Sequence, residues 1–197
     1  MTTRLRDNDI RAATHRRLLR QARACPETIV IDELGLNHGA RRIDIAVING
    51  HIRGIEIKAE ADVLDRLPHQ AAAYGEVVDR ATLIAAPRHI EKAVSLLPDW
   101  WGVIVADRGA TQGLRFRVLR PERANREVNP LMLTRLLWHP EAASILRELG
   151  RPEKLLRHPR EILYQELVAA LPRRILAVRV REALKVREAW RDRPEPL

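Results

Sequence analysis

The stretch that decides the fold runs Arg42-Ile-Asp-Ile-Ala-Val-Ile-Asn-Gly-His-Ile-Arg-Gly-Ile-Glu-Ile-Lys58. Its period of two predicts strands over 42–48 and 51–58, and the Asn-Gly pair between them is typical of a tight antiparallel hairpin. Alternate side chains of a strand project from the same face. We therefore expect Glu56 and Lys58 side by side on one face of the sheet.

The length of the hairpin loop decides whether Asp44 joins Glu56. A two-residue loop puts the two carboxylates on opposite faces of the sheet. A three-residue loop, 48–50, with Gly50 in the left-handed conformation, puts them on one face, with Asp44 opposite Gly54 and room for a metal beside it. Only the odd loop separates an apolar face from a polar one, so we predict it. The apolar face would then hold Ile43, Ile45, Val47, Ile55 and Ile57.

Helical and strand patterns surround this hairpin. They predict, in order, a helix over 7–23, a strand over 28–34, the hairpin, a helix over 64–79, a strand over 82–86, a helix over 89–97, and strands over 102–106 and 114–119. From Pro130 onward the pattern is helical. The order indicates an α/β fold with a mixed sheet flanked by helices. We expect one domain over residues 1–128 and a C-terminal helical extension over 129–197.

The net charge of +9 is spread unevenly along the 197 residues. Residues 1–23 carry a net +5 and residues 151–197 also carry +5, whereas residues 24–98 carry a net −3. Basic ends around an acidic centre suit a protein that binds phosphates and collects a cation. The alternative is compositional, because Arg outnumbers Lys by 31 to 4, as a biased genome would produce.

Several classes of protein are disfavoured. No Gly-rich loop ends in Lys-Ser or Lys-Thr, no serine sits in a nucleophile elbow, and no His or Cys spacing matches a zinc site. No apolar run approaches the ~20 residues that span a bilayer. The Arg-rich N-terminus lacks a secretory signal, and the single Cys25 fits a reducing compartment. We expect a cytoplasmic protein without membrane contact.

One group of residues has the pattern of a reactive site: Asp44, Glu56 and Lys58. Two carboxylates beside an ammonium are costly to bury unless a cation or a phosphate occupies the gap between them. Mg²⁺ or Mn²⁺ would fit, because two carboxylates and a backbone carbonyl, that of Ile57, leave coordination places for water and phosphate. Taken alone, Glu-x-Lys carries almost no information, because a partly exposed strand often alternates charges.

These residues belong to a longer pattern: Arg42-Ile-Asp44, Gly54-Ile-Glu56-Ile-Lys58, and Asp62-x-Leu64-x-Arg66-Leu67-x-x-Gln70-x-x-x-Tyr74. The pattern resembles the PD-(D/E)XK nuclease superfamily, in particular a poorly characterised bacterial subgroup, over roughly residues 30–145. The resemblance implies a restriction-endonuclease-like core of helix, three-strand meander, helix and strand. It also implies a metal-dependent nuclease that hydrolyses phosphodiester bonds, in DNA more than RNA, in DNA repair, defence or a mobile element.

Carried over position by position, the resemblance makes Asp44 and Glu56 metal ligands and Lys58 the catalytic lysine. Gln70 matches a position that approaches the phosphate. Glu33 stands where an upstream acid is found, although here it ends a strand instead of lying on a helix. Tyr74, one turn after Gln70, is interpreted as packing.

The basic residues are the candidate nucleic-acid contacts. Arg41 and Arg42 flank Asp44 and either contact phosphate or balance the acids. The other candidates, at the two ends of the chain, are Arg16, Arg17, Arg173 and Arg174. A rival interpretation is a module that binds nucleic acid or a partner protein without cleaving. A homodimer is left open.

Overall fold

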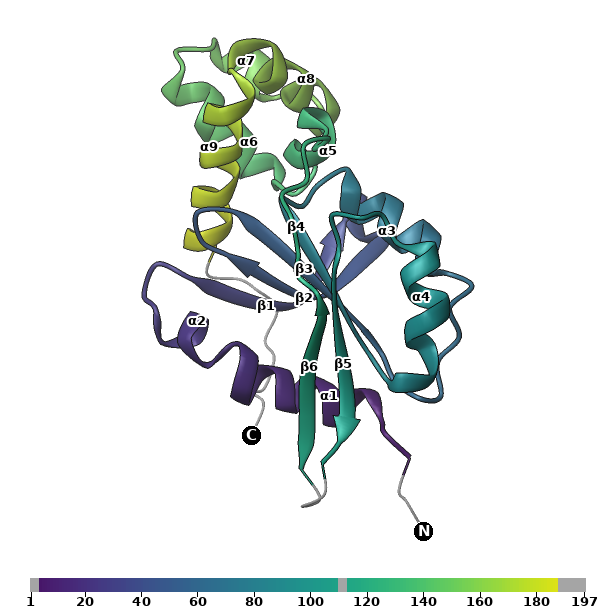
Figure 1. Cartoon of the computed structure of the whole chain (residues 1–197). Helices are drawn as coiled ribbons and strands as arrows, with labels where there is room; N and C mark the ends of the chain where they lie inside the picture. Colours follow the sequence, from purple (N-terminus) through teal and green to yellow (C-terminus); the bar gives the residue numbers. More distant parts are fainter. Residues whose placement is uncertain (1–3, 110–112, 188–197) are drawn as a thin grey trace.

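The computed structural model describes residues 4–109 and 113–187 and shows an α/β fold with one six-stranded sheet flanked by helices (Figure 1). The strands lie in the sheet in chain order: β1 (Ile29–Leu36), β2 (Arg41–Ile48), β3 (Ile52–Lys58), β4 (Arg80–Ala85), β5 (Gly102–Arg108) and β6 (Leu114–Arg120). β1 to β3 form an antiparallel meander, β4 and β5 run parallel to β3, and β6 returns antiparallel. The predicted mixed sheet is confirmed.

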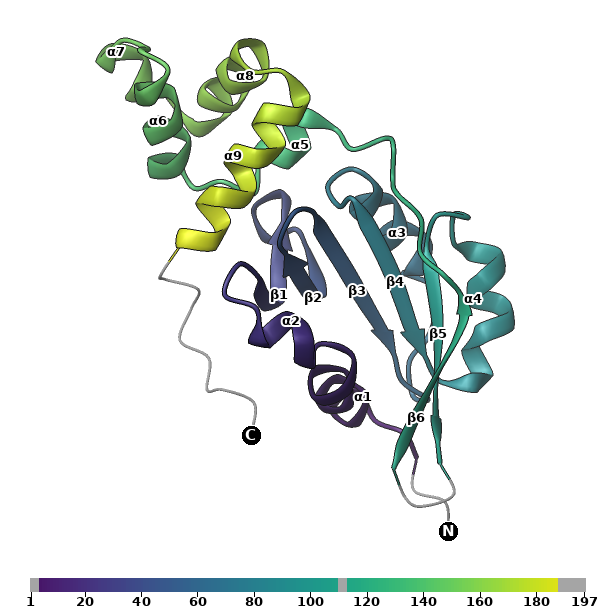
Figure 2. The same ribbon diagram turned by 60° about the vertical axis from the view of Figure 1, so that its left-hand side comes forward.

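Helices cover both faces of the sheet and one of its ends (Figure 2). On one face lie α1 (Asp7–Ala13), the π-helical η1 (Thr14–Leu18) and α2 (Arg20–Ala24). On the other lie α3 (Leu67–Gly75) and α4 (Ile90–Leu96), and short 3₁₀ turns form η2 (Asn37–Gly39) and η3 (Pro87–His89). At the end gather α5 (Pro130–Thr134), α6 (His139–Glu148), α7 (Glu153–Leu156), α8 (Arg160–Ala170) and α9 (Arg173–Val186). No helix of the described segments is long and apolar enough to cross a membrane.

Two predicted helices differ from the structure. The continuous helix over 7–23 is wrong, because a π-helical turn interrupts it and Leu19, with φ −103° and ψ 5°, leaves helical geometry. The helix over 64–79 is shorter and begins at Leu67. Pro68 lies in its first turn, where the missing N–H has no helical partner to lose, so the helix cannot extend far before it.

The β2–β3 loop has the predicted odd length but lies one residue further along the chain. Ile48 pairs with Ile52 and Ala46 pairs with Gly54, so the loop is 49–51 and not 48–50. The predicted position of Asp44 opposite Gly54 is therefore wrong. The physical reason is burial: Ile48 is completely inaccessible to solvent and stays in the strand.

The loop closes through Asn49 and not through a left-handed glycine. The Asn49 side chain accepts a hydrogen bond from the His51 N–H at 3.2 Å, as Asn does in many turns. Gly50 is not among the described glycines with positive φ, so that prediction is wrong. The space above Gly54 is also not left for a metal, because an added Cβ would lie 2.9 Å from the ring of Tyr74.

The side-chain alternation of β1 and β2 breaks at one opposed pair, Glu33 and Asp44. The register on both sides places these residues opposite each other, and Glu33 has a φ of 57°, which is uncommon outside glycine. Across this point Ile45 packs on the α1 face, whereas Ile43 packs on the α3 face. The prediction that Ile43 shares a face with Ile45 is wrong for this reason.

Two apolar clusters stabilise the sheet. The smaller cluster lies under α1 and includes Ile45, Ile55 and Ile57. The larger cluster lies under α3 and α4 and continues without interruption into α5–α9, where Leu163 and Leu176 are fully buried. The sheet and the C-terminal helices therefore share one core.

Candidate functional site

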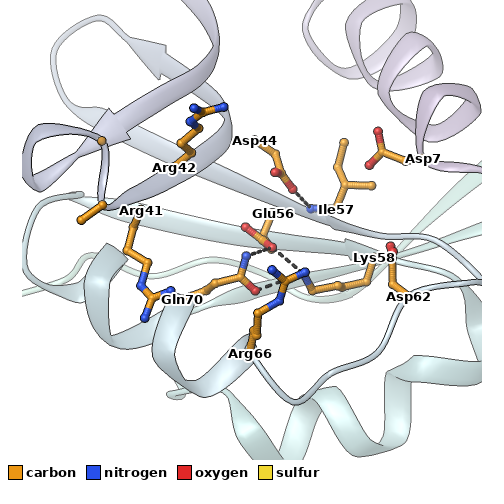
Figure 3. A pocket seen from close by; sticks show the side chains of 12 residues that line it. Asp7, Arg41, Arg42, Asp44, Glu56, Ile57, Lys58, Asp62, Arg66 and Gln70 are labelled. Atoms are coloured by element: carbon orange, nitrogen blue, oxygen red, sulfur yellow. Dashed lines mark hydrogen bonds and ion pairs between the residues drawn. The ribbon is translucent and has the colours of Figure 1, made fainter.

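A cavity of about 520 Å³ opens where β2 and β3 separate, close to the start of α3 (Figure 3). The last pair of the β2–β3 ladder is Ile45 with Ile55, so beyond it the two strands leave room for side chains between them. The residues that line the cavity are Asp7, Gly39, Ala40, Arg41, Arg42, Asp44, Glu56, Ile57, Lys58, Asp62, Arg66 and Gln70. Carboxylates, one ammonium and one amide thus meet in a single polar cavity.

Glu56 is the most enclosed of these groups, with only 1% of its surface exposed. Its Oε1 accepts hydrogen bonds from Lys58 Nζ at 2.6 Å and from Gln70 Nε2 at 2.5 Å. Its Oε2 accepts one from the Tyr74 hydroxyl at 2.7 Å. A carboxylate this deeply buried needs such donors, because its oxygens have lost their hydrogen bonds to water.

Lys58 and Gln70 complete the arrangement from β3 and α3. Lys58 Nζ also donates to Gln70 Oε1 at 3.0 Å, so the ammonium bridges the carboxylate and the amide (Figure 3). Glu56 and Lys58 stand two residues apart on one strand and project from the same face, as the period of two predicts. Gln70 reaches them from the first turns of α3.

Asp44 lies across the gap from Glu56. Its Oδ2 accepts a hydrogen bond from the Ile57 N–H at 2.7 Å, in the place of a ladder bond that the separated strands no longer make. Burial and the neighbouring Glu56 charge raise the pKa of Asp44 from 3.8 to about 7. Two acids are therefore held so close that they resist being charged together.

Sequence reasoning assigned Tyr74 to packing and missed its polar role. The side chain is fully buried, and its hydroxyl donates to Glu56 while it accepts a 3.3 Å hydrogen bond from the Asp44 N–H. Burial and the Glu56 charge raise its pKa well above the usual value, so the hydroxyl keeps its proton. The spacing of four residues from Gln70 was the available signal, because it places both on one side of α3.

Arg11 of α1 was missed as well, and nothing local in the sequence marks it. Its guanidinium donates to the Asp44 carbonyl at 2.7 Å and to Glu33 Oε1 at 3.2 Å, and it lies 3.8 Å from Asp44 Oδ1. Arg11 therefore connects α1 to the point at which the side-chain alternation of β1 and β2 is interrupted. Glu33 is connected to the site through Arg11 and does not line the cavity.

The proposed nucleic-acid contacts divide into two groups. Arg41 and Arg42 line the cavity and are exposed, and Arg66 faces the same opening from the start of α3 (Figure 3). The four arginines of the chain ends do not line it: Arg16, Arg17, Arg173 and Arg174. Arg17 donates to the Leu114 carbonyl of β6, and Arg173 to the Arg126 carbonyl at 3.2 Å.

The donor set suits a hard divalent cation. In a β-strand the N–H and C=O of one residue point to the same side. Since the Ile57 N–H points to Asp44, its carbonyl faces the same gap, next to two carboxylates that repel each other. Oxygen ligands of this kind match Mg²⁺ or Mn²⁺. Within residues 4–109 and 113–187, no three His, Cys, Asp or Glu side chains form a metal-holding group, so the carbonyl would be needed.

In the metal-free protein, Asp44→Asn should increase stability at pH 8 and leave it nearly unchanged at pH 4. Because the pKa is raised to about 7 in the folded state, the folded protein holds this proton more tightly than the unfolded chain does. The resulting stability is present below the unfolded pKa and is lost as the pH rises through about 7. We expect a gain on the order of 2–4 kcal/mol at pH 8, measured by urea unfolding in EDTA.

The control for this experiment is Asp65→Asn, which removes an exposed carboxylate just before α3. It should change stability little at either pH. A wild-type protein and an Asp44→Asn variant with parallel pH profiles would contradict the raised pKa.

This chain is similar to a solved structure and to a phage protein. A solved structure, the SPO1766 protein of unknown function from Silicibacter pomeroyi, is similar with a TM-score of 0.44 and 21% identity, over 77% of this chain and 93% of that one. Protein cII of Enterobacteria phage P4 is 25% identical over 146 residues, which are 74% of this chain and 54% of that protein. This chain thus spans about half the length of the curated relative. The family model described as Bacteriophage P4 protein cII matches residues 1–191, and the chain therefore belongs to that family.

Proposed function

We propose that this chain is a metal-dependent nuclease with a restriction-endonuclease-like core, which hydrolyses phosphodiester bonds in DNA. The observation that carries the proposal is the meeting of Asp44, Glu56 and Lys58 in one polar cavity, with Gln70 beside them. The order of helix, three-strand meander, helix and strand supports the assignment of the core. The phage relative favours a mobile-element setting over DNA repair.

Asp44, Glu56 and the Ile57 carbonyl would hold Mg²⁺ or Mn²⁺, which when bound would supply positive charge to the scissile phosphate and activate water. Lys58 has the position to donate a hydrogen bond to the phosphate and to orient the attacking water. Gln70 holds the Lys58 ammonium in that position through its Oε1. Tyr74 fixes the Glu56 carboxylate and the Asp44 backbone together, so that both ligands keep their spacing.

The second candidate is a cytoplasmic module that binds nucleic acid or a partner protein without cleaving. The observation in its favour is that Glu56 already accepts three hydrogen bonds from within the chain. Such a carboxylate is satisfied without a cation. The raised pKa of Asp44 favours the first candidate, because one acid remains without full compensation.

A panel of linear, circular, single-stranded and branched DNA, together with RNA, tests the proposal with Mg²⁺, Mn²⁺ or EDTA. We expect cleavage of at least one DNA substrate that requires the metal and falls by orders of magnitude in Asp44→Asn and Lys58→Met. Activity that persists in both variants would come from a contaminant. The absence of cleavage by the wild-type protein on every substrate would leave the binding module as the better description.

A further inference from the structure

Three residues of the described chain other than glycine have positive φ, and all three belong to β1 or to the segment that connects β1 with β2. They are Glu33 at 57°, Asn37 at 45° and His38 at 60°. The last two belong to a segment that we call the β1–β2 turn, residues 37–42, which includes the first two residues of β2, paired with Leu36 and Gly35. Its second half, 39–42, forms part of the cavity wall. A backbone conformation with positive φ is unfavourable for residues other than glycine and persists only where surrounding contacts stabilise it.

The contacts that hold the β1–β2 turn come from the C-terminal helices. Arg135, just after α5, donates from one guanidinium nitrogen to Asn37 Oδ1 and from another to Glu161 Oε2, each at 3.0 Å. Glu161 of α8 in turn lies 3.2 Å from His38 Nε2. The His38 ring also stacks on the ring of Tyr164, with centroids 6.0 Å apart and planes 15° apart.

The residues of the C-terminal helices that contact the turn are themselves held by other contacts. Tyr164 is fully buried, and its hydroxyl donates to the Leu137 carbonyl at 2.6 Å. Burial of Glu161 acts against ionisation, but the hydrogen bonds from His38 and Arg135 lower its pKa overall. The carboxylate is therefore charged at neutral pH and can pair at once with His38 of the turn and with Arg135, which itself contacts Asn37.

The part of the turn that faces the cavity is basic and open to solvent. Arg41 and Arg42 are both exposed, and 61% of the Arg42 side chain is accessible. Its ion pair with Glu33 is long, at 3.9 Å, so the guanidinium can reorganise around an anion at little cost. Arginine presents a planar donor pair that suits phosphate oxygens.

We propose that the C-terminal helices set the position of the β1–β2 turn, and that Arg41 and Arg42 on this turn bind a backbone phosphate next to the one in the cavity. The inference rests on the proposed function only in placing a nucleic acid at the cavity. It gives the helices a definite role: His38, Arg135 and Glu161 are positioning residues that act through the turn and do not touch the substrate.

The test is binding of a short DNA duplex in EDTA, where no cleavage occurs. Glu161→Gln should weaken the affinity roughly fivefold, as expected if the competent position of the turn falls to about a fifth of its population. General electrostatics predicts the opposite, because the substitution removes a negative charge. Arg135→Lys, which keeps the charge but loses the planar pair of donors, should weaken binding in the same way.

The matched control is Glu153→Gln in the same group of helices. Glu153 pairs with Arg147 at 2.7 Å on the surface and does not contact the turn. The substitution makes the same change in charge as Glu161→Gln, yet it should leave the affinity unchanged or slightly higher. An Arg41→Ala, Arg42→Ala double variant should lower the log–log salt slope by roughly 0.9, for the loss of one neutralised phosphate. In that background Glu161→Gln should have no further effect.

Three results would overturn the inference. In the first, the wild-type protein would not bind the duplex at all, and in the second, Glu161→Gln and Glu153→Gln would bind it with the same affinity. In the third, Glu161→Gln would still weaken binding by the same factor in the variant that lacks the Arg41 and Arg42 side chains. Cleavage measured in parallel with Mg²⁺ separates this inference from the proposed function. If the variants show the predicted affinities but the protein does not cleave, the role of the turn in binding is supported and the proposed nuclease activity is refuted. Cleavage without the binding pattern would do the reverse.

Discussion

Lys58→Met should reduce DNA cleavage by about a thousandfold and leave the affinity for divalent metal nearly unchanged. The ammonium donates hydrogen bonds to both Glu56 and Gln70, and in the proposed function it contacts the phosphate and orients the attacking water. Loss of one such preorganised electrostatic contact removes on the order of 10²–10³ in rate, and loss of a proton-transfer role adds to this. Cleavage rates would be measured at saturating metal, and metal affinity by calorimetry.

Two further variants make this expectation specific. Lys92→Met removes an exposed lysine of α4 and should cleave like the wild-type protein. Glu56→Gln should lose both metal affinity and cleavage, because it removes a ligand charge. If Lys58→Met and Glu56→Gln lost metal affinity equally, the division between a metal ligand and a catalytic lysine would be wrong.

Glu56→Ala should have the largest effect on folding, a loss of about 3–5 kcal/mol in the free energy of unfolding. The substitution leaves the Lys58 ammonium, whose side chain is 9% exposed, without its carboxylate partner. It also removes the acceptor of the Gln70 and Tyr74 hydrogen bonds. Urea unfolding at pH 7 in EDTA would measure the loss without interference from a bound cation.

A double-mutant cycle identifies the cause of this loss. If the unpaired ammonium dominates, Glu56→Ala combined with Lys58→Met should be more stable than Glu56→Ala alone, because the double variant no longer buries an unpaired ammonium. Additive losses would instead attribute the effect to the cavity left by the side chain.

The sequence predicts well which side chains share a face of β3, because side chains alternate between the two faces of a strand with a period of two. Glu56 and Lys58 project together from β3, and an odd loop follows from the burial of Ile45, Val47, Ile55 and Ile57 in one cluster, although the other face of the hairpin is apolar as well. The position of that loop was wrong by one residue, because the burial of Ile48 and the hydrogen bond of Asn49 to His51 outweigh the preference of glycine for a left-handed conformation.

The remaining features depend on contacts between segments that are distant in the chain. The break in alternation at Glu33 and Asp44 involves two strands at once, and Arg11, 33 residues before Asp44, stabilises it. No periodicity within one strand encodes such a break. Tyr74 gave a local signal, but its polar role depends on a hydroxyl that meets Glu56 across the fold.

The shared core has a consequence for the order in which the protein is made. All six strands precede residue 121, whereas α5–α9 begin at Pro130. During synthesis the nascent sheet therefore carries apolar surface that only the last third of the chain can cover. Until those helices emerge and dock, this surface is open to association with other chains, and folding is completed late.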